Sequence, residues 1–126
     1  MRIFTGYYAK QKYYENNGCI CISIAGRCPN WYHGLEYKKL APKYGFFMKW
    51  KNGQLNNDEY VDHFYSEVLD KLDALEVWNE IKTVSNKAKI VILLCYEKPG
   101  DFCHRHIVAD WFNTELENIP EVIEYE

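Results

Sequence analysis

The sequence KIVILLC at 89–95 constrains the fold more than any other stretch of the chain. It is rich in β-branched residues and continuously apolar, without the alternation that marks a strand with one face in water. Such a run is typical of a strand buried on both faces, which occurs mainly in parallel sheets covered by helices on both sides. It therefore predicts an α/β protein in which this strand lies in the middle of the sheet.

Two segments nearer the N-terminus predict further strands. RIFTGYYA at 2–9 begins with alternating apolar residues, and GCICISIAG at 18–26 alternates cysteine, isoleucine and small residues at a period of two. Gly26 and Pro29 then mark a loop. At the other end of the chain, VIEYE at 122–126 is either a short last strand or a tail.

Apolar side chains at three- and four-residue spacings predict three helices in the second half of the chain. The first begins near Asp58, the second follows DALE at 73–76, where Asp73 fits a capping box, and the third covers about 102–117. The segment 35–53, broken by proline and glycine, is expected to hold short helical turns. The side chains expected to face the core are Leu40, Phe46, Phe47, Trp50, Val61, Phe64, Tyr65, Val68, Leu72, Leu75, Trp78, Ile81, Val84, Ile107, Val108, Trp111, Phe112 and Leu116.

The order of these elements predicts the fold class. Strands come first, helices lie between them, and a buried strand feeds the last helix, which is the order of an α/β protein. The chain of 126 residues has no internal repeat and no low-complexity linker, and 48% of its residues are hydrophobic, enough for one core. We therefore expect a single compact domain over 1–126 with a mainly parallel, Rossmann-like sheet flanked by helices.

Charge and hydropathy exclude several classes of partner. The formal net charge of −3 gives no global attraction to nucleic acid or to an anionic membrane, and the lysines between 38 and 51 are better explained as a solvated face. The longest apolar run, Ile90 to Cys95, is far shorter than a membrane span, and the first residues lack a secretory signal. We expect a cytoplasmic protein, with neither membrane nor nucleic acid as a partner.

Cysteine and aromatic contents bear on redox state and assembly. Five cysteines are an odd number, which in a chain without an export signal favours reduced thiols. The eleven tyrosines and four tryptophans suit a dimer interface as well as a ligand pocket, so a homo-oligomer stays open.

The stretch LLCYEKPGDFCHRHIVADWF at 93–112 is the best candidate for a functional site. It places a thiol, a carboxylate, an imidazole and a guanidinium around one strand-to-helix turn. Ligands of parallel sheets usually bind beyond the carboxyl ends of the strands. Cys95 and Glu97 are expected at that edge, as is Arg27, which follows the second predicted strand.

The start of the last helix has two interpretations. With Asp101 as N-cap, the free amides and the helix dipole would lower the pKa of the Cys103 thiol and bind an anion, while Arg105 would grip an oxygen pair. The alternative is structural, with Cys95 in the core and Arg105 in a salt bridge to Glu97. A third constellation is a zinc site from Cys95, Cys103 and His104. No Cys-x2-Cys pair supports it, so neither metal nor cofactor is predicted.

The segment LLCYEKPGDFCHR resembles the hallmark of the domain of unknown function 488 family, and the resemblance extends over nearly the whole chain. IFTGYYAK, SIAGRCPNWYHGLEYKKLAP and EYVDHFYSEVLDKL are similar to blocks of its short members. The resemblance implies a compact α/β fold in a cytosolic protein of prokaryotes or phages and no established reaction. The positions that it marks are Arg27, Pro29, Trp31, Tyr60, Tyr65, Cys95, Glu97, Cys103, His104 and Arg105.

These residues suggest a pocket for a small anionic ligand with a planar part, most economically a nucleotide. Arg27 and Arg105 would hold the anion, with His104 and Cys95 beside them, and Tyr7, Tyr8 and Trp31 would supply ring faces. In an enzyme, Glu97 would act as general base or nucleophile, or Cys103 would attack as a thiolate. In a binding protein that sequesters or senses the ligand, the same residues would serve without turnover.

Overall fold

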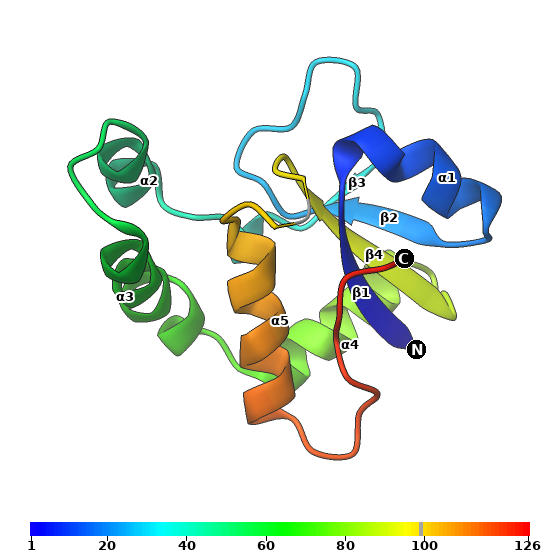
Figure 1. Cartoon of the computed structure of the whole chain (residues 1–126). Helices are drawn as coiled ribbons and strands as arrows, with labels where there is room; N and C mark the ends of the chain where they lie inside the picture. The colour runs from blue at the N-terminus through cyan, green and yellow to red at the C-terminus, as the bar shows by residue number, and fades with distance from the viewer. Residues whose placement is uncertain (99) are drawn as a thin grey trace.

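Four parallel strands form one sheet in the computed structural model, which describes residues 1–98 and 100–126 (Figure 1). The strands are β1 (Arg2–Tyr7), β2 (Ile20–Ser23), β3 (Leu35–Glu36) and β4 (Ile90–Cys95), in the order β1-β4-β2-β3. Every adjacent pair is parallel. The predicted α/β class is confirmed.

Strand β4 occupies the central position that its apolar run predicts. It pairs with β1 on one side, where Phe4 faces Ile92, and with β2 on the other, where Cys21 faces the same residue. Val91 and Leu93 contribute to the larger core cluster, whereas Ile92 and Leu94 contribute to the smaller one. Alternate side chains of β4 therefore serve two cores, which is why the whole run is apolar.

The helices cover both faces of the sheet (Figure 1). The helices α3 (Asn57–Glu67), α4 (Ala74–Val84) and α5 (His104–Glu115) pack on the larger core, and α1 (Gln11–Asn16) packs on the smaller one. Helix α2 (Tyr44–Lys51) lies against α3. Three short 3-10 helices cover Tyr8–Lys10, Lys38–Leu40 and Leu69–Lys71. None of the helices that the structure describes is long and apolar enough to cross a membrane.

The N-terminal caps of the helices agree with the prediction only in part. Asp73 caps α4 by accepting a hydrogen bond from the Glu76 amide at 2.9 Å, as predicted. A full capping box occurs instead at α3, where Asn56 and Glu59 bond to each other's backbone amides. Helix α5 begins at His104 with Cys103, in extended backbone, as its N-cap, so the prediction of Asp101 as the cap is wrong. The Asp101 amide instead donates to the Lys98 carbonyl at 3.2 Å, and the chain is extended at Cys103, two residues beyond the expected cap.

The buried face of α4 is also rotated from the predicted one. Ala74, Val77 and Ile81 are buried, whereas Leu75 is 57% exposed and Val84 is 37% exposed. Both sets of residues recur at helical spacing, so periodicity alone does not choose between them. Packing against the sheet and α5 selects the smaller side chains.

Short elements escaped the prediction because they lack a periodic signal. Helix α1 and the two-residue β3 were not expected. The C-terminal segment lies along β1 through a bridge between Thr5 and Glu124, and the Tyr125 amide donates to the Thr5 carbonyl at 2.9 Å. VIEYE at 122–126, expected as a short last strand or a tail, therefore forms one isolated β-bridge with β1. That bridge brings a carboxylate from the chain end to the start of α5.

Candidate functional site

A cleft of about 770 Å³ opens at the carboxyl ends of β2 and β4. Its volume lies within the range of small-molecule sites, roughly 300–1,000 Å³. The cleft is bounded by the loop after β2, the helix α2, and the loop between β4 and α5. Of the residues predicted to form a site, it brings together Arg27, Cys95, Glu97, Cys103 and His104.

One wall of the cleft is aromatic. Trp50 of α2 and Phe102 lie with ring centroids 5.4 Å apart, and Tyr60 of α3 lies 5.3 Å from Trp50 and 5.1 Å from Phe102. Trp50 and Phe102 are half-buried, whereas Tyr60 is buried, and burial raises the pKa of its hydroxyl. These rings leave apolar edges and faces against which a planar group can pack.

Exposed charges face this wall from two loops. Arg27 follows β2 and Glu97 follows β4, and these two strands are neighbours, so their ends meet at one edge of the sheet. The Tyr96 hydroxyl donates a hydrogen bond to the Arg27 carbonyl and joins the two loops. The ion pairs between described residues include neither Arg27 nor Glu97. Both charges are thus available to a ligand.

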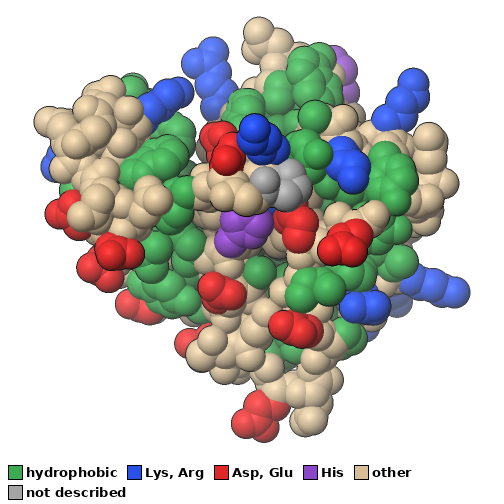
Figure 2. All heavy atoms as spheres, viewed as in Figure 1, with side chains coloured by type: hydrophobic (Ala, Val, Ile, Leu, Met, Phe, Trp, Pro, Cys, Tyr) green, Lys and Arg blue, Asp and Glu red, His purple; other side chains and the backbone are tan. Residues whose placement is uncertain are grey.

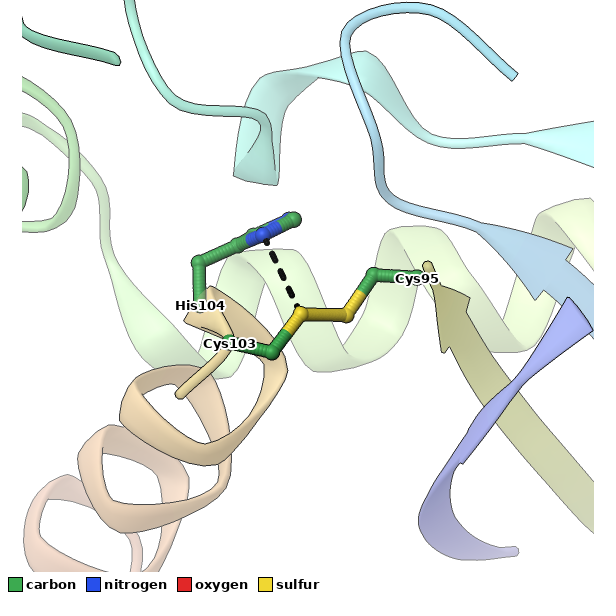
Figure 3. A group of neighbouring side chains, drawn as sticks. All are labelled: Cys95, Cys103 and His104. Carbon is green, nitrogen blue, oxygen red and sulfur yellow. Dashed lines mark hydrogen bonds between the residues drawn. A yellow bond between two sulfur atoms is a disulfide. The ribbon is translucent and has the colours of Figure 1, made fainter. Parts of the chain in front are cut away.

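The sulfur atoms of Cys95 and Cys103, which both line the cleft, are joined in a disulfide (Figure 3). The prediction that all cysteines are reduced is therefore wrong, because an odd total does not prevent one pair from meeting across the short loop between β4 and α5. Cys19, Cys21 and Cys28 form no disulfide among the described residues. The structure likewise lacks the reactive Cys103 thiolate expected at the helix start.

His104 is buried beside this sulfur pair. Its Nε2 lies 2.8 Å from the Ile24 carbonyl oxygen, which can only accept, so Nε2 carries the proton. Nδ1 is then an acceptor, and it lies 3.9 Å from the Cys103 sulfur. Burial lowers the pKa of His104 to about 4, against a smaller upward effect of the bond to Ile24. The ring also stacks on Phe64 at 5.6 Å. The imidazole is therefore neutral and held in one tautomer.

Arg105 lies behind the cleft. Its guanidinium is fully buried and makes a bidentate contact with the Glu124 carboxylate, at 3.0 Å from Nε and 2.9 Å from Nη2. Nη1 donates to the Cys95 sulfur at 3.2 Å and to the Glu97 carbonyl. Arg105 does not offer its fork to the cleft as predicted, and the alternative of a salt bridge to the Glu97 carboxylate is wrong too. The fork is occupied by an acid from the chain end.

Glu124 is the residue of this region that the sequence did not reveal. Burial alone raises the pKa of its carboxyl group, but hydrogen bonds from Arg105 and Thr5 outweigh burial and hold the pKa below its usual range. Glu124 is 19 residues from Arg105, and no spacing rule joins the two. The one signal in the sequence was that VIEYE at 122–126 could form a short last strand.

The three aromatic residues predicted to hold the ligand lie outside the lining of the cleft. Tyr7 places its ring 5.9 Å from the Arg105 guanidinium. Tyr8 is buried, hydrogen-bonded to Ser23, and its ring contacts that of Trp31 at 6.2 Å. The aromatic rings of the cleft come instead from α2, α3 and Phe102. Helical spacing in the sequence predicts which side chains point inward, but it does not predict which of them line a cleft.

A second hollow of about 750 Å³ runs along α4, and the Glu80 carboxylate in it is already engaged. Lys39 and Tyr37 both bind the Glu80 carboxylate, the lysine at 3.0 Å. None of the predicted site residues lies there. On the face seen in Figure 2, acidic and basic side chains both occur among exposed hydrophobic ones, which does not make a field of one sign. The cleft at the end of β4 is the candidate site.

A family model described as the active DUF488-N3 subclade matches residues 15–116, well over half of the chain. The chain belongs to the DUF488 family. No curated protein and no solved structure matches the chain. The matched residues of this DUF488 domain include the whole lining of the cleft, whereas Glu124, the partner of Arg105, lies beyond them. The resemblance expected from the sequence is confirmed, and the family, being one of unknown function, supplies no reaction.

Proposed function

We propose that this DUF488 protein is an enzyme that acts on a small anionic molecule with a planar part, a nucleotide or another phosphorylated metabolite. The observation that carries the proposal is the meeting of Arg27, Glu97 and an aromatic wall in one cleft at the carboxyl ends of neighbouring parallel strands. This edge is where ligands of open α/β sheets bind.

Binding is assigned to the cations and the rings. The exposed Arg27 forks onto two phosphate oxygens, and Lys51 adds a point charge from the end of α2. The first turn of α5 adds the positive end of its dipole, since Cys103 and His104 lie in the wall. Trp50 and Phe102 pack against the planar part.

The reactive group in this proposal is Glu97. The carboxylate lines the cleft, and its own backbone carbonyl accepts a hydrogen bond from the buried Arg105, which fixes the loop that carries it. A carboxylate so placed serves as general base or as nucleophile. The Cys103 sulfur is bonded to Cys95 and is less suited to attack. The word active in the description of the family model also favours catalysis.

A binding protein without turnover is the second candidate, because Glu97 is the one carboxylate among the described residues that line the cleft. Glu97→Gln separates the two. In an enzyme, this change leaves ligand affinity nearly intact and abolishes turnover. In a sequestering or sensing protein, it affects neither, because there is no turnover to lose.

The test is titration calorimetry of the full chain with AMP, ribose 5-phosphate and inorganic phosphate. We expect at least one of the three to bind, and Arg27→Ala to weaken its binding about tenfold or more, because a hydrogen bond to a charged group contributes roughly 1.5–3 kcal/mol. Lys12→Ala, an exposed lysine of α1 outside the cleft, is the matched control and should change nothing. Absence of binding by all three probes, or equal losses in the two variants, contradicts the proposal.

A further inference from the structure

The buried group of Cys95, Cys103 and His104 has no part in the binding of an anion by Arg27 or in the chemistry of Glu97 (Figure 3). Both sulfurs and a ring nitrogen of His104 lie within 4.8 Å of one another, and all three side chains are buried. Two thiols and one imidazole are the ligand set of a borderline-soft metal ion such as zinc.

We propose that in the reduced protein Cys95, Cys103 and His104 bind one zinc ion, through both sulfurs and Nδ1 of the histidine. The site is independent of the anion-binding proposal, because it needs neither Arg27 nor Glu97.

The orientation of His104 fits a metal ligand. Histidine ligands usually donate their second ring N–H to a carbonyl or a carboxylate, which fixes the ring and makes the free nitrogen more basic. Nε2 of His104 does this with the Ile24 carbonyl at 2.8 Å. Nδ1 is left with its lone pair directed toward the Cys103 sulfur, 3.9 Å away. The ring is thus already oriented for a cation between these two atoms.

The spacing also fits. Tetrahedral zinc with Zn–S near 2.3 Å and Zn–N near 2.0 Å sets sulfur and nitrogen about 3.6 Å apart and two sulfurs about 3.8 Å apart. The observed sulfur-to-nitrogen distance of 3.9 Å is close to the first value. The Cα atoms of the two cysteines are 7.3 Å apart, which is wider than the roughly 4.4–6.8 Å usual for disulfides. The backbone therefore has room for two separate sulfurs.

The charges around the group balance once the metal is bound. Two thiolates neutralise a divalent cation, so the buried cluster carries no net charge. Arg105 donates to the Cys95 sulfur at 3.2 Å, which suits a thiolate, and its own charge is balanced by Glu124 at 2.9 Å. Arg105 therefore acts as an outer partner that holds Cys95 in place.

Three protein ligands leave the fourth position of the metal open. Cys19 packs in the smaller core, and the Cys28 thiol donates to Glu36 at 3.2 Å, so neither completes the set. Cys95, Cys103 and His104 all line the cleft, so a fourth ligand would reach the metal from there. Sites with three protein ligands and one open position are typical of catalytic rather than structural zinc. Water or a ligand oxygen would take that position.

Reduction must precede metal binding. The S–S bond of Cys95–Cys103 is broken by two equivalents of a small-molecule thiol, which give two electrons and two protons to the cysteine sulfurs and leave as their own disulfide. Zinc then replaces both thiol protons, which are released to solvent. A cytoplasmic location, with its thiol pool, would keep the pair reduced.

The test is Co²⁺ titration of the full chain, reduced with a small-molecule thiol that is removed under nitrogen. We expect one Co²⁺ per chain, with thiolate-to-cobalt charge-transfer bands and the visible bands of a tetrahedral ion, both lost on addition of Zn²⁺. Cys103→Ser and His104→Asn should each weaken Co²⁺ binding by about 100-fold or more. That loss is larger than the roughly 10–100-fold expected when only a hydrogen-bond partner of a metal ligand is removed. Cys28→Ser is the matched control and should bind as the wild type does.

A second readout decides the matter where a variant does not fold. In the wild type, Zn²⁺ should slow alkylation of Cys95 and Cys103 and leave Cys28 unaffected. The proposal is overturned if the reduced wild type shows no charge-transfer bands. It is also overturned if Cys28→Ser loses these bands as fully as Cys103→Ser does, or if Zn²⁺ does not slow alkylation of Cys95 and Cys103. Since cobalt binding is measured without any nucleotide, a chain that binds Co²⁺ but none of the anionic probes supports the metal site alone.

Discussion

Two regions meet at the start of α5, and consecutive residues serve them differently. His104 faces the cleft with Arg27 and Glu97, where charges are exposed and no ion pair between described residues holds them. Arg105 points the other way, into a buried network with Glu124 and Thr5, where each guanidinium nitrogen and the Thr5 hydroxyl have an acceptor. The two arginines, assigned the same task from the sequence, therefore have opposite environments. On the cleft side, the charges of Arg27 and Glu97 are exposed to a ligand. On the β1 side, Arg105 and Glu124 are paired, and Arg105 also binds the carbonyl of Glu97 in the loop after β4.

The largest effect is expected when the buried arginine is removed. Arg105→Ala leaves Glu124 without its partner and opens a cavity, and the loss of one member of a buried pair costs roughly 3–5 kcal/mol. Arg27→Ala, on the cleft side, should stay within about 0.5 kcal/mol of the wild type. Urea unfolding of both variants measures the contrast. If both variants lost a similar amount of unfolding free energy, the two arginines would not differ in their contribution to stability.

Removal of the carboxylate should come next and should depend on pH. Glu124→Gln leaves a buried cation with a neutral partner, at a cost of about 3 kcal/mol near neutral pH. Because the folded pKa of Glu124 lies below its usual range, its contribution is present above the unfolded pKa and is lost as the pH falls through the folded value. The gap in unfolding free energy between variant and wild type should therefore narrow in acid.

The exposed Glu121→Gln is the control for that series. Its stability should follow that of the wild type at every pH. A gap for Glu124→Gln that stays constant, or widens, on acidification would contradict the ion pair as the source of the effect.

Two glycines show how tightly the backbone is packed on the β1 side and in the cleft. A Cβ on Gly6 of β1 would lie 2.6 Å from the Tyr14 hydroxyl oxygen and 2.7 Å from Ile92, whereas a Cβ on Gly26 in the cleft would meet only Ala41, at 3.9 Å. Overpacking typically costs 1–3 kcal/mol, so Gly6→Ala should cost about 2 kcal/mol. Gly26→Ala should cost little, and thermal unfolding compares them. Equal shifts in Tm would show that the cleft side is packed as tightly as the β1 side.

The smallest effect is expected at the hydrogen bond that joins the two cleft loops. Tyr96→Phe removes the bond to the Arg27 carbonyl, which is worth about 1 kcal/mol at most in this exposed setting. We expect hydrogen exchange in residues 25–28 to rise while exchange in β1 stays unchanged. Faster exchange in β1 as well would mean that the two regions are coupled.

Elements with a strong, continuous signal were predicted correctly. The run at 89–95 identified the central strand, and Arg27 and Glu97 line one cleft because they follow neighbouring strands of the sheet. Asp73 was found because a cap is a local contact within one turn. Helix α1 and strand β3 were missed because each is short and has no repeated apolar spacing.

The cleft brings together several residues that the sequence grouped as a candidate site, but the directions of their side chains could not be predicted. Cys95, Glu97, Cys103 and His104 are close in sequence, so their proximity needed no long-range information. The direction of each side chain did, because Arg105 turns away only when Glu124 arrives from the C-terminus. Trp50 packs against the larger core, as expected, but the sequence did not show that its ring would also line the cleft.

The central claim is that the Arg27 side of the α5 start binds an anionic, planar ligand. A crystal structure of the protein soaked with AMP tests it most directly. We expect phosphate density at Arg27 and Lys51, with the base against Trp50 and Phe102 and the Arg105–Glu124 pair unmoved. AMP bound to another surface, or a cleft without density, would contradict it.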